Sequence, residues 1–235
     1  ETCHNVSFNP KNKIFIPDAF AFCTPYHIET FKDIQTEKKV IMYPLEIIPF
    51  NEIKHKNALD KLKFDTKKTN VLSVGLWCDN KNQAKVLEIA EQYTDYDFHI
   101  VGNQAENFAD YWKPLMKKIP KNVKVWGERE DIEDFMILSD IFLFPSKKEC
   151  NPIVLREAIS HELTIYANNL TQYCDMYDGI IKPLDSPKIK YQARVNSTND
   201  TFHFKNDHED LYKSILKSKI MKQPKEGKVS INHHF

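Results

Sequence analysis

Glycine is scarce in this sequence, and its few positions are informative. The chain has five glycines in 235 residues. Three of them, Gly75, Gly102 and Gly127, each follow a short apolar run. Glycine loses more conformational freedom on folding than any other residue, so a chain that otherwise avoids it keeps it where a tight turn requires it. The sequence therefore predicts tight turns at three strand ends.

Cysteine is also sparse. The five cysteines are scattered and never form a Cys-x-x-Cys pair, which argues against a disulfide framework and a structural zinc site. The pattern favours a reducing, cytoplasmic location. Histidine and cysteine are not clustered, so we expect no metal site.

Net charge and long apolar runs are absent as well. Lys plus Arg and Asp plus Glu both number 33, so the sequence predicts no nucleic-acid partner. No apolar run approaches the roughly 18 residues that cross a bilayer, and we expect no transmembrane segment. The chain begins with Glu1, so we expect a piece of a longer protein.

Short apolar runs alternate with helical patterns along the middle of the chain. Uninterrupted apolar strands joined by helices are typical of a parallel sheet buried on both faces. The sequence predicts an α/β fold with a doubly wound, Rossmann-like parallel sheet over roughly residues 65–190. The expected strands are Val71–Val74, Phe98–Val101, Val123–Trp126, Ile141–Phe144, Leu163–Ala167 and Ile180–Ile181, and the expected helices are Gln83–Gln92, Phe108–Lys118, Ile132–Leu138 and Pro152–Ser160.

The flanking segments carry weaker patterns. Residues 14–44 predict a strand, a helix that begins at Thr24-Pro25, and a second strand at Val40–Tyr43. A helix is expected near Asn57–Leu62, and another at His208–Ile220 in the polar end of the chain.

The strongest local pattern runs from Pro145 to Glu157. A buried strand ends at Phe144, and Glu149 follows in the loop. Asn151 is a good N-cap and Pro152 suits the first helical position, which places Glu157 on the helix. The amides of the first helical turn favour a phosphate, and two carboxylates suit hydroxyl groups. The pattern predicts a ligand with both.

This pattern resembles the EX7E motif of retaining GT-B glycosyltransferases, most closely those of family 4. The loop Val74–Asn82 is similar to the family's phosphate-binding loop, Val101–Asn103 to its Val-Gly turn, and Val125–Gly127 to its third strand end. The resemblance covers residues 70–185 well. It implies that the fold is the nucleotide-sugar-binding domain of a GT-B enzyme.

The resemblance also implies roles for residues. Lys81 would neutralise the donor diphosphate, Glu149 would contact the hydroxyls of the transferred sugar, and Glu157 would hold the ribose. The base would lie near Gly127–Arg129. The full set of implied catalytic and donor-binding residues is Gly75, Leu76, Lys81, Gly102, Asn103, Gly127, Glu128, Arg129, Glu149, Asn151, Pro152, Ile153, Val154 and Glu157.

The implied reaction needs neither a metal nor a cofactor. A sugar would pass, with retention, from a UDP- or GDP-sugar to a hydroxyl acceptor such as a saccharide or glycoconjugate. Residues 1–50 would be a remnant of the N-terminal acceptor domain and the crossing between domains, 51–190 the donor domain, and 191–235 a helix and polar tail. The missing N-terminal domain would be the partner.

One departure from the family pattern concerns Leu76. It stands where the family usually has a phosphate-binding arginine. Lys147, Lys148 or Arg156 would have to substitute. Arg156 is otherwise interpreted as a surface helix residue.

Simpler interpretations stand beside these roles. Glu149 could form an exposed ion pair with its neighbours Lys147 and Lys148. Trp77 is expected in the core or a pocket wall, although its loop makes sugar stacking conceivable. His99 is expected to be a satisfied interior histidine, and Cys150 a packing residue.

Two other functions remain open. A degenerate donor domain could act as a nucleotide-sugar-binding or assembly module. A GT-B-shaped nucleotide-sugar epimerase is the other alternative. An oxidoreductase is disfavoured because no G-x-G-x-x-G follows a strand. The carboxylate pair alone does not exclude a glycoside hydrolase, but the loop that contains Lys81 argues for a phosphate ligand instead.

Overall fold

The structure is a computed structural model that describes residues 2–3, 9–12, 15–41, 46–170, 177, 179–186 and 188–191. The chain divides into two compact units. The first holds the described residues up to 41, and the second holds those from 46 onward. Each unit is described by itself. The helix expected at His208–Ile220 lies outside the described residues.

The first unit contains a three-stranded parallel sheet of order β1-β2-β3. Phe20, Phe22 and Phe31 pack together and are fully buried. The helix begins at Tyr26 with Pro25 as its N-cap, one residue later than predicted, and the hydroxyl of Thr24 accepts a hydrogen bond from the amide of Tyr26 at 3.3 Å. The elements are β1 Thr2–Cys3, a 3-10 turn η1 at Pro10–Asn12, β2 Ala19–Phe22, α1 Tyr26–Thr30 and β3 Glu37–Val40.

The strand predicted at Val40–Tyr43 begins earlier than expected. In the structure β3 spans Glu37–Val40, paired in register with Ala19–Phe22. The prediction relied on an apolar run to locate the strand. Because β3 is only partly buried, it can contain Glu37 and its lysine neighbours, which give no apolar signal.

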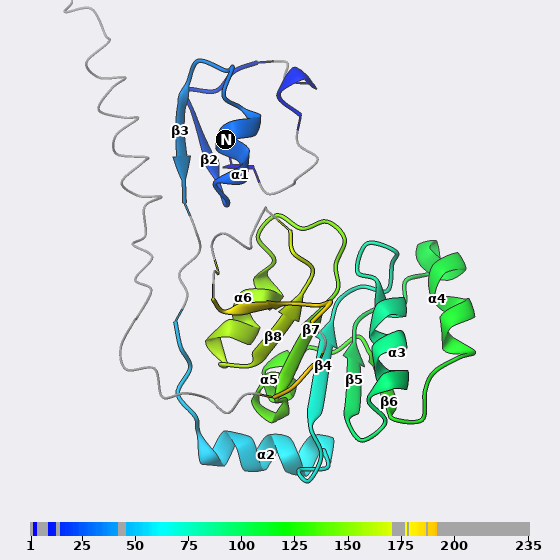
Figure 1. The fold of residues 1–235 in the computed structure, drawn as a ribbon. Helices are drawn as coiled ribbons and strands as arrows, with labels where there is room; N and C mark the ends of the chain where they lie inside the picture. Colours follow the sequence, from blue (N-terminus) through cyan, green and yellow to red (C-terminus); the bar gives the residue numbers. More distant parts are fainter. Residues whose placement is uncertain are drawn as a thin grey trace, which may run out of the picture. The chain divides into compact units, whose positions relative to one another are not determined.

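The second unit is a six-stranded sheet of order β6-β5-β4-β7-β8-β9, and every pair of neighbours is parallel (Figure 1). The prediction of a doubly wound α/β fold is confirmed. The strands are β4 Asn70–Val74, β5 Asp97–Val101, β6 Val123–Gly127, β7 Ile141–Phe144, β8 Thr164–Ala167 and β9 Ile181–Pro183. The helices are α2 Glu52–Leu62, α3 Gln83–Gln92, η2 Glu106–Phe108, α4 Ala109–Met116, α5 Ile132–Leu138 and α6 Ile153–Ser160.

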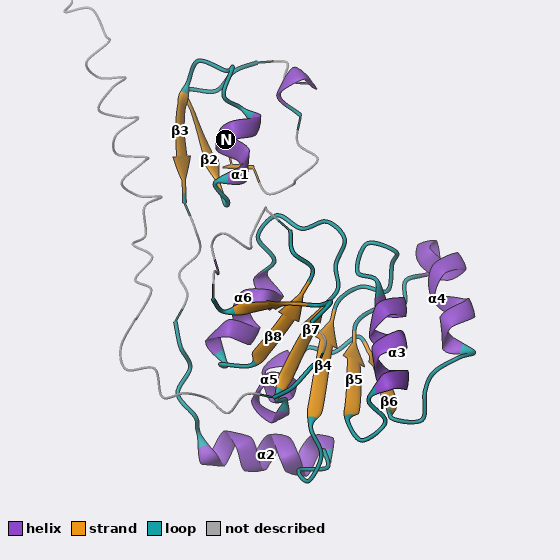
Figure 2. Ribbon diagram, in the orientation of Figure 1, coloured by secondary structure: helices purple, strands orange, loops and turns teal. Residues whose placement is uncertain are grey.

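Helices cover the sheet because its strands are apolar on both faces (Figure 2). Ile141 and Leu143 of β7 join a buried cluster with Val86 and Ala90 of α3. Phe142 and Phe144 alternate with them and are equally buried, as the period of a strand requires.

Helix α2 starts earlier than the sequence suggested. It begins at Glu52, and not near Asn57, because the side chain of Asn51 accepts the amide of Lys54 at 2.9 Å. Only Ala58 and Leu62 of this helix are buried, so its first turns lack the apolar stripe that would have revealed them.

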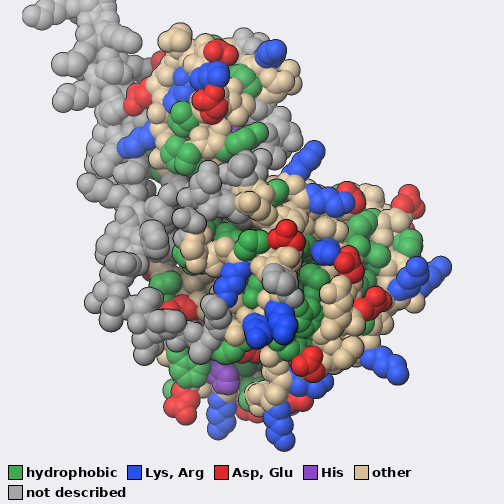
Figure 3. Space-filling view, viewed as in Figure 1, with side chains coloured by type: hydrophobic (Ala, Val, Ile, Leu, Met, Phe, Trp, Pro, Cys, Tyr) green, Lys and Arg blue, Asp and Glu red, His purple; other side chains and the backbone are tan. Residues whose placement is uncertain are grey.

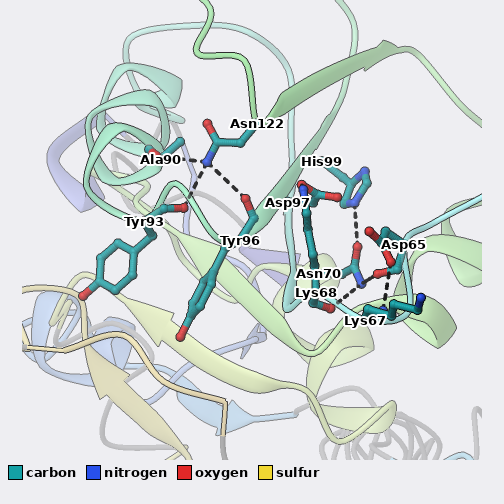
Figure 4. Close-up of polar contacts among 10 residues, drawn as sticks. All are labelled: Asp65, Lys67, Lys68, Asn70, Ala90, Tyr93, Tyr96, Asp97, His99 and Asn122. Atoms are coloured by element: carbon teal, nitrogen blue, oxygen red, sulfur yellow. Dashed lines mark hydrogen bonds and ion pairs between the residues drawn. The ribbon is translucent and has the colours of Figure 1, made fainter.

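A closed polar network runs from Asn70 at the amino end of β4, which Figure 4 shows bonded to His99, through the middle of β5 to Trp126 of β6. His99 Nδ1 accepts from Trp126 Nε1 at 3.2 Å, so Nε2 carries the proton and donates to Asn70 Oδ1 at 3.0 Å. The ring of Phe64 stacks on His99 at 3.7 Å. Burial, and next the charge of Lys124, lower the pKa of His99 to about 3. The expected satisfied interior histidine is confirmed.

The charges of the second unit are dispersed. Basic and acidic side chains alternate over the face that Figure 3 shows, in keeping with a net charge of +0. Within the described residues, no helix combines the length and apolarity that crossing a bilayer requires.

Candidate donor site at the carboxyl ends of the strands

The strand order reverses between β4 and β7, and a doubly wound sheet opens a crevice at such a reversal. The loops that follow these two strands are bound to each other. The amide of Lys147 donates to the carbonyl of Asn80 at 2.8 Å, and Asn80 Nδ2 donates to the carbonyl of Lys148 at 3.0 Å. The two loops therefore form one wall.

The glycine turns lie side by side along this edge. Gly75 N donates to Val101 O at 2.9 Å, and Gly102 N donates to Gly127 O at 2.7 Å. Gly102 has φ +154°, and a Cβ there would lie 1.9 Å from Gly75 O. Gly127 has φ +70°. Tight turns are confirmed at these two glycines, whereas Gly75 instead admits the stem of Lys81.

Lys81 and Glu149 form an ion pair between the loops that follow β4 and β7. Lys81 Nζ lies 2.6 Å from Glu149 Oε1, and the two side chains are 24% and 12% exposed. The sequence suggested Lys147 and Lys148 as the partners of Glu149, and that interpretation is wrong. Lys147 instead pairs with Asp79 at 2.6 Å. Residues 68 apart in sequence meet here because the strand order places their loops together.

Helix α6 begins at this crevice, one residue later than predicted. Pro152 is its N-cap with extended backbone, so Pro152 is not the first helical residue and Asn151 is not the cap. Asn151 Oδ1 instead accepts from the hydroxyl of Tyr177 at 3.3 Å. In the described part of the chain, the amides of Ile153 and Val154 have no acceptor.

Glu157 and Arg156 differ in burial. Glu157 is exposed on α6, one turn beyond the two unpaired amides. Arg156 is 6% exposed, so its interpretation as a surface residue is wrong. Sequence patterns identify the buried face of a helix from its apolar residues. A charged residue such as Arg156 is therefore assigned to the surface, even when its long side chain lies on the buried face.

The carboxyl end of β6 carries the third part of the predicted site. Asn103 Nδ2 donates to Glu128 Oε2 at 2.9 Å and so bridges the turns after β5 and β6. Arg129 makes two bonds to Asp131, of 2.8 and 2.7 Å. These bonds, together with Lys61, hold the pKa of Asp131 well below its usual range. The Arg129 guanidinium is therefore already committed to Asp131.

Several side chains lie where the sequence could not place them. Trp77 is fully buried, which excludes sugar stacking. Cys150 is 7% exposed, in keeping with packing. Sequence reasoning missed Gln83, whose Nε2 donates to the carbonyls of Gly75 and Leu76 at 3.2 and 3.0 Å and so orders the first loop. A glutamine at a helix start gives no warning of this role.

The sequence contains one Asp-x-Asp triplet, at Asp95–Asp97. It lies at the amino end of β5, away from the crevice, and Asp97 pairs there with Lys68 at 2.7 Å. Among the described residues, no group of three or more His, Cys, Asp or Glu could hold a metal ion. The expectation of a metal-independent reaction stays a prediction.

Known proteins resemble this chain in fold and in sequence. Anabaena HepE, solved in complex with UDP, matches with a TM-score of 0.65 and 16% identity over 77% of this chain and 57% of that one. WaaG, a glycosyltransferase involved in lipopolysaccharide biosynthesis, matches with a TM-score of 0.54 and 21% identity over 67% and 46%. These likenesses show the GT-B glycosyltransferase fold.

Among curated proteins, the capsular polysaccharide biosynthesis glycosyltransferase CapH of Staphylococcus aureus is 28% identical over 116 residues, which are 46% of this chain. The match spans 33% of the length of that relative. The family model for glycosyl transferases group 1 matches residues 68–214, more than half of the chain. The protein therefore belongs to the group 1 glycosyl transferases.

Proposed function

We propose that the second unit is the donor domain of a retaining, family 4-like glycosyltransferase. It would bind a UDP- or GDP-sugar and pass the sugar to a hydroxyl acceptor on a saccharide or glycoconjugate. The observation that carries the proposal is the unpaired start of α6, beside the Lys81–Glu149 pair. Backbone N–H groups at a helix start attract phosphate.

Each proposed role follows from the position of a residue. The amides of Ile153 and Val154 and the ammonium of Lys81 meet the diphosphate. Glu149 accepts bonds from the sugar hydroxyls. Glu157, which is exposed on α6, accepts hydrogen bonds from the ribose hydroxyls. Catalysis is then mainly positioning and stabilisation of the leaving diphosphate.

The base subsite is proposed at the turns after β5 and β6. Because Arg129 is held by Asp131, the backbone of Gly127–Arg129 and the side chains of Asn103 and Glu128 are left to contact the base. Another cation must take the role of the phosphate-binding arginine that Leu76 replaces. We propose Lys148, which is exposed in the loop after β7, because Lys147 is paired with Asp79.

The rest of the enzyme is also a proposal. Residues 1–50 belong to the acceptor side, 51–190 form the donor domain, and 191–235 follow as a helix and tail. Turnover would need the remaining N-terminal domain as partner. The cytoplasmic location inferred from the scattered cysteines stays a prediction.

Calorimetric titration with UDP, GDP, ADP and NAD tests the proposal. We expect one nucleoside diphosphate to bind selectively. Glu157→Ala and Lys81→Ala should each weaken that binding about tenfold or more, because each removes a charged hydrogen bond. Both variants should stay folded: Glu157→Ala should keep the melting temperature of the wild type, whereas Lys81→Ala should lower it because the mostly buried Glu149 loses its partner.

Glu88→Ala is the matched control, because Glu88 is an exposed helical glutamate on α3 whose ion pair, among the described residues, is with Lys85. Its nucleotide affinity should equal that of the wild type. Unchanged affinity in both site variants would sink the assignment.

The degenerate module is the second candidate, and Leu76 in place of the family's arginine favours it. A module would bind a protein partner without measurable affinity for any nucleotide. Absence of all nucleotide binding in the wild type, with partner binding intact, would shift the conclusion to it.

A further inference from the structure

The Lys81–Glu149 pair is unlike the other ion pairs of the second unit. Of the pairs whose side chains are both described, it is the least exposed, at 24% and 12%. The Lys147–Asp79 pair joins the same two loops, but its side chains are 46% and 76% exposed. Charges that are partly withdrawn from water interact more strongly than exposed ones.

Lys81 has little freedom to leave this pair. A methyl group on Gly75 would meet Lys81 Cγ and Cδ at 3.3 Å, so the stem of the lysine passes close to the backbone. Its ammonium also lies 5.4 Å from the centroid of the Phe144 ring. An anion that binds Lys81 must therefore do so close to Glu149.

That closeness has opposite effects on two ligands. A bare diphosphate competes with Glu149 for the ammonium and leaves a mostly buried carboxylate next to an anion. A nucleotide that carries its sugar offers hydroxyl groups, which can donate to Glu149 and replace the lost ammonium bond.

We propose that Glu149 makes the site select the sugar-bearing nucleotide over the spent nucleoside diphosphate. This inference rests on the proposed donor site. When the sugar has left, Glu149 recaptures Lys81 and weakens the hold on the product. The ion pair thus acts on specificity and on product release.

The main test is Glu149→Gln, titrated calorimetrically with inorganic pyrophosphate, UDP and GDP. The substitution keeps the shape and removes the competing charge. We expect pyrophosphate and the preferred nucleoside diphosphate to bind the Glu149→Gln variant about tenfold more tightly than they bind the wild type. For the nucleotide sugar that the wild type binds best, the preference over its diphosphate should fall by a similar factor.

Asp79→Asn is the matched control. It removes one negative charge from an ion pair of the same length in the same loops, but at an exposed position. It should raise diphosphate affinity less than about twofold. An equal gain in Asp79→Asn and Glu149→Gln would overturn the inference, since a general charge effect would explain both.

The double variant Lys81→Gln/Glu149→Gln tests whether the gain in diphosphate affinity that Glu149→Gln produces depends on Lys81. We expect it to abolish the gain, and a gain that persists without Lys81 would contradict the proposal. Glu149→Ala frees the same ammonium and gives the same measurement if the glutamine variant does not fold.

The outcomes separate this inference from the proposed function. If the wild type binds a nucleoside diphosphate and Glu157→Ala weakens it, but Glu149→Gln shows no gain, only the selection by Glu149 fails. If neither the wild type nor Glu149→Gln binds pyrophosphate or any nucleotide, both proposals fail.

Discussion

The two ends of the sheet treat their polar groups in opposite ways. At the amino ends, the protein satisfies them itself. His99 is bonded through both ring nitrogens, to Trp126 and to Asn70 at the amino end of β4. Asn122 Nδ2 donates to three carbonyls, those of Ala90, Tyr93 and Tyr96 (Figure 4). Such a closed network rigidifies the structure and offers few groups to a ligand.

At the carboxyl ends, polar groups are left open. The amides of Ile153 and Val154 have no acceptor within the described chain. Four buried side-chain atoms likewise lack a partner within the described chain: Trp77 Nε1 and Ser146 Oγ in the loops after β4 and β7, Gln83 Oε1 at the start of α3, and His161 Nε2 at the end of α6. The first three lie toward the carboxyl ends, whereas His161 lies toward the amino end of β8. Buried polar groups without partners are rare and need a reason. The contrast is in keeping with the donor site that we propose at the carboxyl ends.

Among the variants that test the difference between the two ends of the sheet, Gly102→Ala should have the largest effect on stability. The new methyl group would lie 1.9 Å from Gly75 O, so backbone must move. We expect a loss of about 3 kcal/mol or more in the free energy of unfolding and a loss of nucleotide binding. Gly127→Ala is the control, because nothing lies within 4 Å of its Cβ and only φ +70° opposes it, at about 1 kcal/mol. Equal costs would contradict the close packing of the turns.

Asn122→Ala should separate stability from binding. Three carbonyls lose their donor, and we expect a cost of about 2–3 kcal/mol in urea unfolding with unchanged nucleotide affinity. Asn80→Ala, which removes a single exposed bond at the other end, should cost less than about 1 kcal/mol. A weakened affinity in a folded Asn122→Ala protein would break the division of roles.

His99 should make the amino-end network sensitive to acid. Its pKa is about 3 in the folded protein against an ordinary 6.5, so the unfolded chain binds more protons between these values. Stability is therefore lost as the pH falls below 6.5, by about 2 kcal/mol between pH 7.5 and pH 5. Denaturant titrations at both pH values measure this. His99→Gln should lose that part of the pH dependence, and an identical profile in the variant would contradict it.

Lys54→Ala should have the smallest effect and sets the scale for the others. Lys54 pairs with Glu133 at 2.7 Å, but both side chains are about half exposed. We expect a change of less than about 0.5 kcal/mol in thermal unfolding. A cost of 2 kcal/mol or more would show that exposed pairs matter here as much as the networks do.

Much of the fold could be predicted because the core strands and helices carry regular apolar periods. Gln83–Gln92, Ile132–Leu138 and Ile141–Phe144 match the structure residue for residue. The errors fall where burial is slight. Strand β3 and the first turns of α2 lack the apolar pattern, so the sequence misplaced their starts.

The candidate site was less predictable than the fold. The sequence pointed to the loops of the candidate site because glycines and a helix start mark them. Its simpler alternative for Glu149 was an ion pair with Lys147 or Lys148, whereas the partner is Lys81, and it placed Arg156 on the surface, whereas Arg156 is buried. Both errors concern contacts across the fold, which a local pattern does not encode.

By itself, the sequence determined the α/β class, the order of strands and helices along the chain, and the edge of the sheet at which we propose the donor site. Apolar period, glycine position and helix capping are local properties, and each is readable from adjacent residues. Only the tertiary structure decided that Lys81 faces Glu149, that Asp79 faces Lys147 and that Gly102 touches Gly75. The two ion pairs follow from the reversal of strand order at β4 and β7, which brings together loops that lie far apart in the chain. The glycine contact follows from the parallel pairing of β4 with β5.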